Sequence, residues 1–468
     1  MFKSLKAQLT ILQQEGYSII RFLAWWIRHP LTFSISSKKP LIITPKARFI
    51  IRLSYIVLTV SLLFLFFYGL TYFTLIPIFV FLVSPFLYFF VALIVLWPYE
   101  KINRQRTIKI INRQITSHPH LTVIGVTGSY GKTSVKDFLF TILSGYQETL
   151  KTPESYNTIF GIAKVVDLEL LSKSKYFICE MGAYIRGEIT ELCRMVPPKY
   201  AILTAIGSQH LERFKSLSNT TLAKFELIDA VKPSHALVNL DNSHIANRLS
   251  LPQYHGVQTY SITNPKADFF IKEYTFSPEG LNFVLIYQNK EYSYTPSLFG
   301  TSNLYNLIAA ISMALLLKVP EKIISQQVAK ITASPHRLEL KKINKATLID
   351  NAFSSNEDGF TALINDFSKL EGKKVLITPG IVELGIRTVE VHQRIGKLAA
   401  GVFDKFVLVG KSLRTLSLEQ GLNSSPAMAG LTPPISYIPN STNLWPLIEE
   451  LSKEYDWILI ENDLPDIF

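Results

Sequence analysis

The sequence has few cysteines and fewer acidic than basic side chains. Only Cys179 and Cys193 occur in 468 residues, too few for a disulfide framework and without the spacing of a metal site. Two reduced cytoplasmic thiols are the simplest interpretation. There are 36 Asp and Glu against 48 Lys and Arg, a formal net charge of +12. The apolar content of 48% excludes a mainly disordered chain, and the length predicts two or three domains.

One long segment lacks charge altogether. No charged residue occurs from Leu53 to Tyr99, a stretch about twice the ~20 residues that a helix needs to cross a bilayer. A break near Gly69 predicts a transmembrane hairpin with spans near 51–71 and 76–97. Basic residues flank both ends, so the positive-inside rule places both flanks in the cytoplasm. Two buried helices of a globular domain are the alternative.

The segment before the hairpin, residues 1–48, interleaves apolar and basic side chains. This pattern predicts an amphipathic segment that lies on the bilayer or packs on the hairpin. The basic charge suits an anionic lipid leaflet, and no DNA- or RNA-binding motif competes to explain it. We therefore expect a protein of the cytoplasmic membrane, with membrane lipid and no nucleic acid among its partners.

A glycine-rich turn joins an apolar strand at 122–124 to a helical run at 134–143. Glycines let backbone N–H groups converge on phosphate oxygens, while the helix N-terminus, a lysine and a threonine supply a dipole, a cation and a hydroxyl for Mg²⁺. Val126 stands where a strict Walker A loop has glycine. The turn still predicts a nucleoside triphosphate, held by Gly128, Ser129, Gly131, Lys132, Thr133 and Ser134.

Beyond residue 107, short β-rich runs alternate with amphipathic helical runs, the pattern of an α/β fold with parallel sheets. We expect strands at 122–124, 176–179 and 200–203, an antiparallel excursion within 256–299, a helix at 304–317, and, from about 335, a second α/β unit with strands at 347–349, 374–377, 406–409 and 457–460. The expected domains are an amphipathic segment (1–48), a transmembrane hairpin (49–98), a P-loop central domain (99–333) and a Rossmann-like C-terminal domain (334–468).

Three polar residues follow these strands in a fixed order. Glu180 ends one strand, His210 follows the next strand, and Lys224 comes fourteen residues after that histidine. Each alone is a weak signal, since a strand-end side chain is often simply solvated. Together with the glycine-rich turn they resemble the Mg²⁺ site of the Mur ligases, most closely the MurF-type branch that adds D-alanyl-D-alanine. The resemblance covers residues 121 to about 412 and is weaker beyond.

This resemblance implies roles for individual residues. Glu180, His210 and Thr133 would hold Mg²⁺, and Lys224 would be carbamylated, which turns a cation into an anionic oxygen ligand suited to that ion. The other residues so implied are Asn303 and Asn306 at the adenine (or as helix N-caps), Arg337 at a nucleotide phosphate, Asp350 at the ribose, and Thr152, Asn157 and Asn356 at the substrates.

The sequence departs from the family pattern at several places. Ser302 replaces a histidine, and Glu461-Asn462-Asp463 stands where the branch usually has Lys-Gly-Ser. His336-Arg337-Leu338-Glu339 matches a Gly-Arg-Leu-Glu linker, and Asp350-Asn351 a double aspartate. The N-terminal uridine-nucleotide-binding domain with its Asp-Ser-Arg signature has no counterpart. The likeness therefore supports the ATP site more strongly than the two other substrates.

The function that these observations favour is a membrane-anchored amide ligase that uses ATP and Mg²⁺. A peptide carboxylate, nucleotide-linked or lipid-linked, would be phosphorylated to an acyl phosphate and then attacked by the amine of an amino acid or dipeptide, in cell-wall peptide synthesis. The C-terminal domain would close over the central one. A polyglutamate-synthase-like membrane ligase and a non-catalytic, ATP-gated membrane scaffold are the alternatives.

Overall fold

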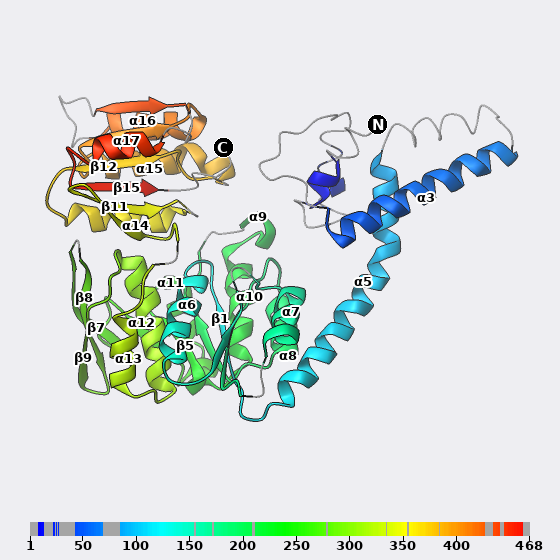
Figure 1. Cartoon of the computed structure of the whole chain (residues 1–468), viewed down its shortest axis with the longest axis horizontal. Coiled ribbons are helices and arrows are strands. Elements are labelled where there is room, and N and C mark those ends of the chain that lie inside the picture. Colours follow the sequence, from blue (N-terminus) through cyan, green and yellow to red (C-terminus); the bar gives the residue numbers. More distant parts are fainter. Residues whose placement is uncertain are drawn as a thin grey trace. The chain divides into compact units, whose positions relative to one another are not determined.

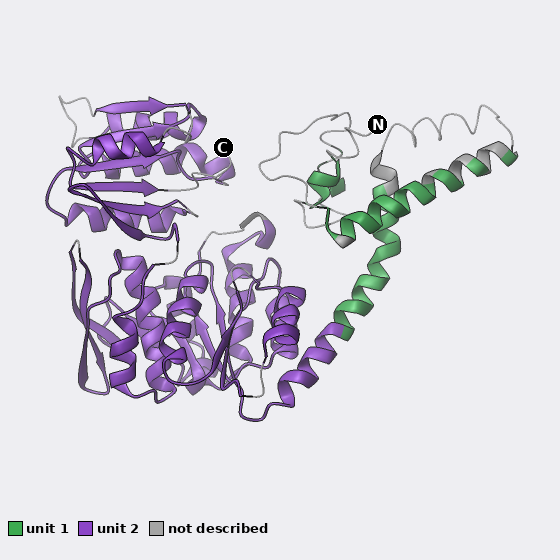
Figure 2. Ribbon diagram, viewed as in Figure 1, with its two compact units in different colours: residues 1–106, 467 green, residues 107–466, 468 purple. Residues whose placement is uncertain are grey.

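The computed structural model describes residues 8–13, 22–23, 25, 27, 43–68, 85–153, 156–170, 173–207, 211–277, 279–333, 335–352, 355–382, 384–425, 434–439 and 444–461. The chain forms two compact units that divide after Arg106 (Figure 2). Helix α5 (Pro85–Thr116) passes through this division. The boundary expected at 98/99 therefore lies inside a continuous helix.

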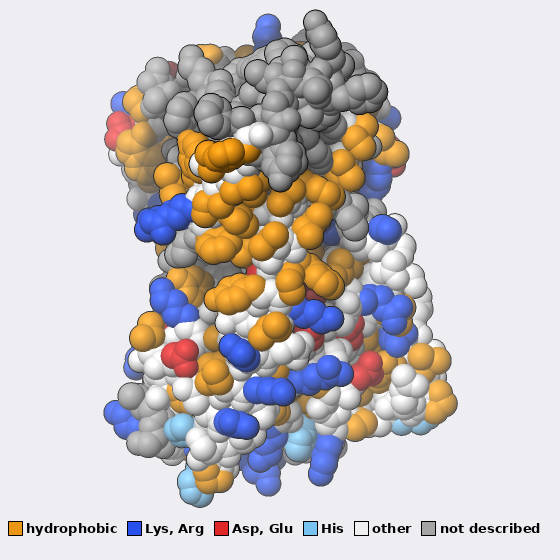
Figure 3. All heavy atoms as spheres, turned by 90° about the vertical axis from the view of Figure 1, so that its right-hand side faces the viewer, with side chains coloured by type: hydrophobic (Ala, Val, Ile, Leu, Met, Phe, Trp, Pro, Cys, Tyr) orange, Lys and Arg blue, Asp and Glu red, His pale blue; other side chains and the backbone are white. Residues whose placement is uncertain are grey.

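The first unit contains helix α3 (Pro45–Tyr68) and the first part of α5. Its small core consists of Leu9, Leu12, Phe22, Ala47, Ile50, Phe89, Ala92, Leu93 and Leu96. Many other large apolar side chains on the two helices are exposed, among them Ile56, Phe67 and Trp97. Figure 3 shows hydrophobic side chains gathered on this surface, with Lys and Arg side chains nearby.

The transmembrane hairpin expected from the sequence is not confirmed. Within the described ranges, no helix is at once long enough and apolar enough to cross a bilayer. Helix α5 continues far beyond the expected end at 97 into a run with Lys101, Arg104 and Arg106, so its second half is polar. Residues 69–84 and most of 1–48, on which the rest of that expectation falls, lie outside the described residues.

The second unit begins with a nine-stranded sheet in the part of the chain that is described. Its strands, in spatial order, are β2 (Thr149–Lys151), β3 (Tyr176–Glu180), β1 (Thr122–Thr127), β4 (Tyr200–Leu203), β5 (Ala236–Asn239), β6 (Gln258–Ser261), β7 (Phe269–Ser277), β8 (Gly280–Tyr287) and β9 (Lys290–Tyr294). Pairing is parallel from β2 through β7 and antiparallel from β7 to β9. The predicted parallel sheet and antiparallel excursion are both confirmed.

Helices cover both faces of this sheet (Figure 1). One face packs on α6 (Lys132–Ser144), α12 (Thr301–Leu316) and α13 (Glu321–Val328). The other packs on the end of α5 and on α7 (Ile159–Glu169), α8 (Glu188–Met195), α10 (Leu217–Asp229) and α11 (Ser243–Leu249). The short helices α9 (Leu211–Phe214), η1 (Pro233–His235) and η2 (Pro252–Tyr254) complete this part. Because both faces are covered, β1 and β3 are buried at every position and their sequences are apolar without alternation.

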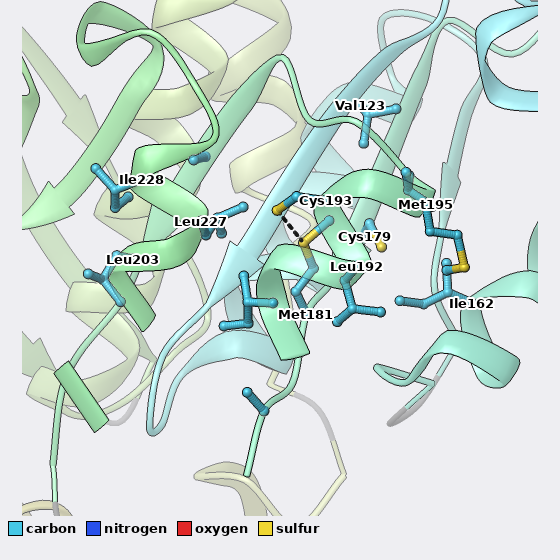
Figure 4. Close-up of a cluster of buried hydrophobic side chains, with 14 of the residues drawn as sticks. Val123, Ile162, Cys179, Met181, Leu192, Cys193, Met195, Leu203, Leu227 and Ile228 are labelled. Atoms are coloured by element: carbon cyan, nitrogen blue, oxygen red, sulfur yellow. Dashed lines mark hydrogen bonds between the residues drawn. The ribbon is translucent and has the colours of Figure 1, made fainter. Parts of the chain in front are cut away.

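The two cysteines lie in the core of this domain (Figure 4). Cys179 is on β3 and Cys193 on α8, and both are free thiols. The Cys193 Sγ lies 3.9 Å from the Met181 Sδ. Burial raises the pKa of Cys193 to about 12, so this thiol is unreactive at neutral pH. Neither cysteine forms a disulfide in this structure, and their reduced state in a cytoplasmic compartment stays a prediction.

A second sheet, of six strands among the described residues, follows in the same unit. In spatial order its strands are β10 (Glu339–Ile343), β11 (Ala346–Asn351), β15 (Trp457–Glu461), β12 (Lys374–Thr378), β13 (Lys405–Val409) and β14 (Ile435–Ile438). Helices α14 (Glu357–Ser368), α15 (Thr388–Ala399) and α16 (Leu413–Asn423) cover one face and α17 (Leu444–Leu451) the other, with η3 (Gly385–Arg387) before α15. Only β10 is antiparallel to its neighbour. The expected second α/β unit is thus confirmed.

Candidate active site

The glycine-rich turn connects β1 to α6 at the carboxyl end of the central sheet, where parallel sheets place their ligands. Gly131 has φ 83°, a left-handed conformation, and caps α6 without a side-chain hydrogen bond. A Cβ at Gly128 would lie 2.0 Å from the Thr204 Oγ1, and one at Gly131 would lie 2.4 Å from the Asn306 Oδ1. Both positions therefore require glycine, and the α6 N-terminus stays open to an anion.

Lys132 turns back onto this loop. Its Nζ donates to the Gly128 carbonyl at 2.8 Å and to the Ser129 carbonyl at 3.3 Å. Burial lowers the pKa of the Lys132 ammonium, nearby Glu180 opposes that shift, and Arg337 adds to it. The ammonium is thus held inside the curve of the loop, where the terminal phosphates of a bound nucleotide would lie.

Glu180 ends β3 beside the loop and is 2% exposed. The Thr133 hydroxyl donates to its Oε2 at 3.0 Å, and the Asn157 amide donates to its Oε1 at 3.2 Å. The Glu180 backbone N–H donates to the Thr152 hydroxyl at 3.0 Å. Thr152 is fully buried, so its position supports Glu180, whereas Asn157 also lines a cavity. The predicted roles of both at a substrate remain predictions.

Lys224 lies on α10 and reaches the same place. It is 3% exposed and lines a cavity of about 30 Å³ together with Ser129, Lys132, Asn157, Gly182, Ala183, Tyr184 and Phe214. That volume suits a small group such as a carboxylate oxygen or a water molecule. Burial, assisted by the Lys132 charge, lowers the pKa of Lys224 to about 7. A large fraction of this amine is therefore neutral, and hence nucleophilic, at physiological pH.

The fourth predicted metal ligand, His210, lies outside the described residues. The Thr133 hydroxyl and the Glu180 carboxylate are hard oxygen donors in direct contact, which fits Mg²⁺. Among the described residues, His336, Glu339 and Asp350 form a different cluster of three potential metal ligands. The Lys341 Nζ pairs with two members of that group and lies 3.0 Å from Glu339 and 3.1 Å from Asp350. That group is an ion-pair network and carries no metal assignment.

A larger cavity, of about 330 Å³, opens on the other side of the loop. This volume is typical of small-molecule sites. Tyr130, Gly131 and Ser134 contribute from the loop and α6, and the ends of β4 and β5 contribute Thr204, Ala205, Asn239, Asp241 and Asn242. Ser302, Asn303 and Asn306 come from α12, Arg337 from the linker, and Asn351, Ser355, Asn356, Asp358 and Glu461 from the C-terminal part. Five of the ten residues predicted to bind the nucleotide therefore line one cavity, namely Gly131, Ser134, Asn303, Asn306 and Arg337.

The two asparagines predicted at the adenine line this cavity. The cap of α12 is Gly300, which excludes the alternative that either asparagine caps that helix. The Asn303 amide donates to the Phe299 carbonyl at 3.0 Å, and the Asn306 side chain faces Gly131. Their placement is consistent with the predicted role.

Asp350 lies beside the cavity, and its neighbour Asn351 lines it. The Asp350 carboxylate accepts from the His336 Nδ1 at 2.8 Å and from the Lys341 Nζ at 3.1 Å. His336 and Leu338, on either side of Arg337, both have φ 58°, a conformation that costs a non-glycine residue about 1–2 kcal/mol. The linker thus holds Arg337 in the cavity between two strained residues, and the ribose role of Asp350 remains a prediction.

The strain at His336 leads to a testable expectation. His336→Ala loses the contact with Asp350 and keeps the strained backbone, whereas His336→Gly loses the contact and relieves the strain. We expect the alanine variant to be less stable than the glycine variant by about 1 kcal/mol, measured by urea unfolding. Equal stabilities of the two variants would contradict the strained assignment.

Sequence reasoning missed several residues of this site. Asn239 ends β5, a short strand that was not expected, Asp241 follows that strand, and both residues line the larger cavity. Tyr130 lines it from within the loop, and burial followed by the Asp358 charge raises its pKa to about 12. Lys136 lies one turn beyond Lys132 and is fully buried. A lysine on the apolar face of α6 was the signal that could have identified it.

The part of the chain that carries the glycine-rich turn is similar to a known protein family. Residues 126–314 match the family model of the Mur ligase middle domain. This part of the chain is therefore similar to the Mur ligase middle domain. The match includes Lys132, Glu180, Lys224 and both asparagines of α12, whereas Arg337 and the cavity residues after it lie outside the matched range.

Individual relatives and solved structures show the same similarity. The UDP-N-acetylmuramoyl-tripeptide–D-alanyl-D-alanine ligase of Buchnera aphidicola is 28% identical over 301 residues, which are 62% of this chain and 64% of the relative. The chain thus spans less than two thirds of that relative's length. MurF from Acinetobacter baumannii has a TM-score of 0.66 at 24% identity over 77% of each chain. MurF from Thermotoga maritima, solved with ADP, has a TM-score of 0.65 at 21% identity over 77% of this chain and 80% of the other. The two structures establish a shared fold.

Proposed function

We propose that this chain is an ATP- and Mg²⁺-dependent carboxylate–amine ligase that acts in cell-wall peptide synthesis. The observation that supports this most directly is the meeting of Lys132, Asn157 and Lys224 around one small cavity, with Glu180 bonded to Asn157. The cavity adjoins a loop built for phosphate, so a carboxylate placed in it would lie next to the terminal phosphate of a nucleotide. The name of the Buchnera relative supports the MurF-type reaction.

The first step joins two anions. A carboxylate oxygen of the acceptor peptide attacks the γ-phosphorus of ATP, a new O–P bond forms, and the bond between that phosphorus and the bridging oxygen of ADP breaks. Lys132 and Arg337 lie around the loop and the larger cavity, where their charge would offset repulsion between carboxylate and phosphate. The adenosine would occupy the larger cavity, against Asn303 and Asn306.

The second step forms the amide. The amine of an amino acid or dipeptide attacks the carbonyl carbon of the acyl phosphate, the C–O bond to phosphate breaks, and the amine nitrogen loses a proton. Thr133, Glu180, Lys224 as a carbamate, and His210 would hold Mg²⁺, which neutralises charge on the phosphates. Lys224 can form the carbamate by reaction with CO₂, because its lowered pKa leaves the amine partly neutral.

The test is ADP release by the purified chain. We expect release to require Mg²⁺, an acceptor carboxylate and an amine together, with UDP-linked muramoyl tripeptide and D-alanyl-D-alanine as the first pair. Omitting either substrate should lower the rate at least about tenfold. A non-catalytic scaffold would bind ATP without forming an amide, and a polyglutamate-type enzyme would prefer glutamate as the amine. Either result would overturn the proposal.

The form of the acceptor and the location of the protein are proposed from sequence alone. The uncharged stretch within 51–97 motivates a membrane location with the ligase domains in the cytoplasm, and a lipid-linked acceptor would fit residues 1–120, which show no uridine-nucleotide signature. In the same assay, the soluble and lipid-linked peptides are offered at equal concentration in detergent. Preference for the soluble form would remove the lipid-linked version and leave the ligase assignment intact.

A further inference from the structure

A lysine outside the phosphate loop is buried next to the predicted metal ligand. Lys136 lies on α6, one helical turn after Lys132, and its side chain is 0% exposed. Lysine is almost never fully buried without a partner, because removing its charge from water is costly. The position therefore needs an anion close by.

The carboxylates of Glu180 and Asp137 supply the negative charge close to Lys136. The Lys136 Nζ lies 3.5 Å from the Glu180 Oε2 and 3.9 Å from the Asp137 Oδ1. Asp137 also accepts from Lys151, at 2.8 Å, nearer the surface. The four side chains form a row of alternating charge, Lys151, Asp137, Lys136 and Glu180, whose formal charges cancel. Glu180 is thus balanced by a cation before any metal binds.

The same carboxylate oxygen has two neighbours. The Glu180 Oε2 accepts from the Thr133 hydroxyl at 3.0 Å on one side and faces Lys136 on the other. A divalent ion bound by Thr133 and Glu180 would lie within a few ångströms of the Lys136 ammonium. At such distances, inside a protein, two like charges repel each other much more strongly than they do in water.

We propose that Lys136 is a positioning residue that acts as the resident counter-ion of Glu180. It holds the carboxylate against Thr133 while the metal is absent, and its charge weakens the site's hold on the divalent ion, so that the ion can leave with the product nucleotide. This inference rests on the proposed function only in that Glu180 is taken as a metal ligand. It needs no assumption about the acceptor or the amine.

Lys136→Met keeps much of the apolar stem and removes the charge. In the nucleotide-free protein we expect Mn²⁺, used as a probe, to bind about tenfold more tightly by calorimetry, because a like charge beside the ligand has been removed. In EDTA the variant should melt several degrees below the wild type, since buried Glu180 loses the cation paired with it and keeps only the more distant charges of Lys132, Lys224 and Arg337. Adding Mg²⁺ should restore most of that loss.

Two further variants complete the test. Lys151→Met removes the partly exposed cation at the other end of the row and should leave Mn²⁺ binding within about twofold of the wild type. Lys136→Met/Glu180→Gln removes both buried charges and should melt above Lys136→Met in EDTA. If Lys136→Met does not fold, recovery of folding in the double variant is the supporting result.

Three results would overturn the proposal. They are unchanged or weaker Mn²⁺ binding in Lys136→Met, equal loss of stability with and without Mg²⁺, and a double variant no more stable than the single one. A lysine that only fills space would give an equal loss of stability with and without Mg²⁺. None of these measurements uses a ligase substrate. The test of Lys136 can therefore be interpreted even if the proposed reaction is wrong, and the proposed reaction can stand even if the role of Lys136 is wrong.

Discussion

Replacing Lys132 with alanine is expected to lower substrate-dependent ADP release at least about a hundredfold. The Lys132 Nζ lies inside the curve of the phosphate loop, bonded to the Gly128 and Ser129 carbonyls. From this position the Lys132 ammonium would stabilise the negative charge of the phosphoryl group while that group moves from ATP to the acceptor carboxylate. Alanine leaves the loop's backbone donors in place, so nucleotide binding should fall less than turnover. Steady-state ADP release and ADP binding by calorimetry measure the two effects.

The matched control is Lys173→Ala. The Lys173 side chain is 68% exposed and pairs with Glu148 on the surface, so its loss should leave turnover near that of the wild type. If Lys132→Ala keeps wild-type ADP release with both substrates present, the glycine-rich turn is not a catalytic phosphate site.

Lys224→Ala is expected to be inactive and to regain part of its activity with a short carboxylate such as acetate. The lysine lines the small cavity with Lys132 and Asn157, and its pKa of about 7 leaves a nucleophilic amine available to CO₂. A carbamate there would supply the anionic oxygen that alanine lacks, and acetate can occupy the same space. The loss should be about a hundredfold or more, because the residue proposed to provide a ligand of the metal is removed.

Carbamylation can also be observed directly. Wild-type protein kept in ¹³C-bicarbonate should show a carbamate carbon signal that is missing from Lys224→Ala. Full activity of the alanine variant without acetate, or an unmodified Lys224 in active protein, would remove the carbamate from the mechanism.

The main strands of the fold could be predicted because covering both faces of a sheet leaves a local signature. The apolar run of β1 and those of β3 and β4 read directly as buried strands, and the β-rich runs of β7, β8 and β9 as an antiparallel set. The strands that were missed, such as β2 and β6, are only three or four residues long. Such short strands owe their conformation to pairing with neighbours more than to their own sequence.

For the helices near the N-terminus, the sequence predicted membrane spans that the structure does not confirm. A lack of charge from 53 to 99 predicted two spans, but a composition window does not register where a helix ends. Helix α5 continues to Thr116 through a basic, polar turn, and part of its later face packs on the central domain through Ile108, Ile111 and Ile115. Long-range packing, which hydropathy cannot register, set the length of this helix.

The sequence by itself determined the phosphate loop, the acidic end of β3, Lys224 and the asparagines of α12, because glycine, charge and amide chemistry are written in single residues at fixed spacing. Only the tertiary structure decided how these residues act on one another. It placed Thr152 under the Glu180 backbone, Asn351 in the cavity beside Asp350, and Lys136 against Glu180. The contacts of Thr152 and Lys136 with Glu180 join residues far apart in the chain, and burial, not sequence spacing, fixes both their distances and their electrostatic strength.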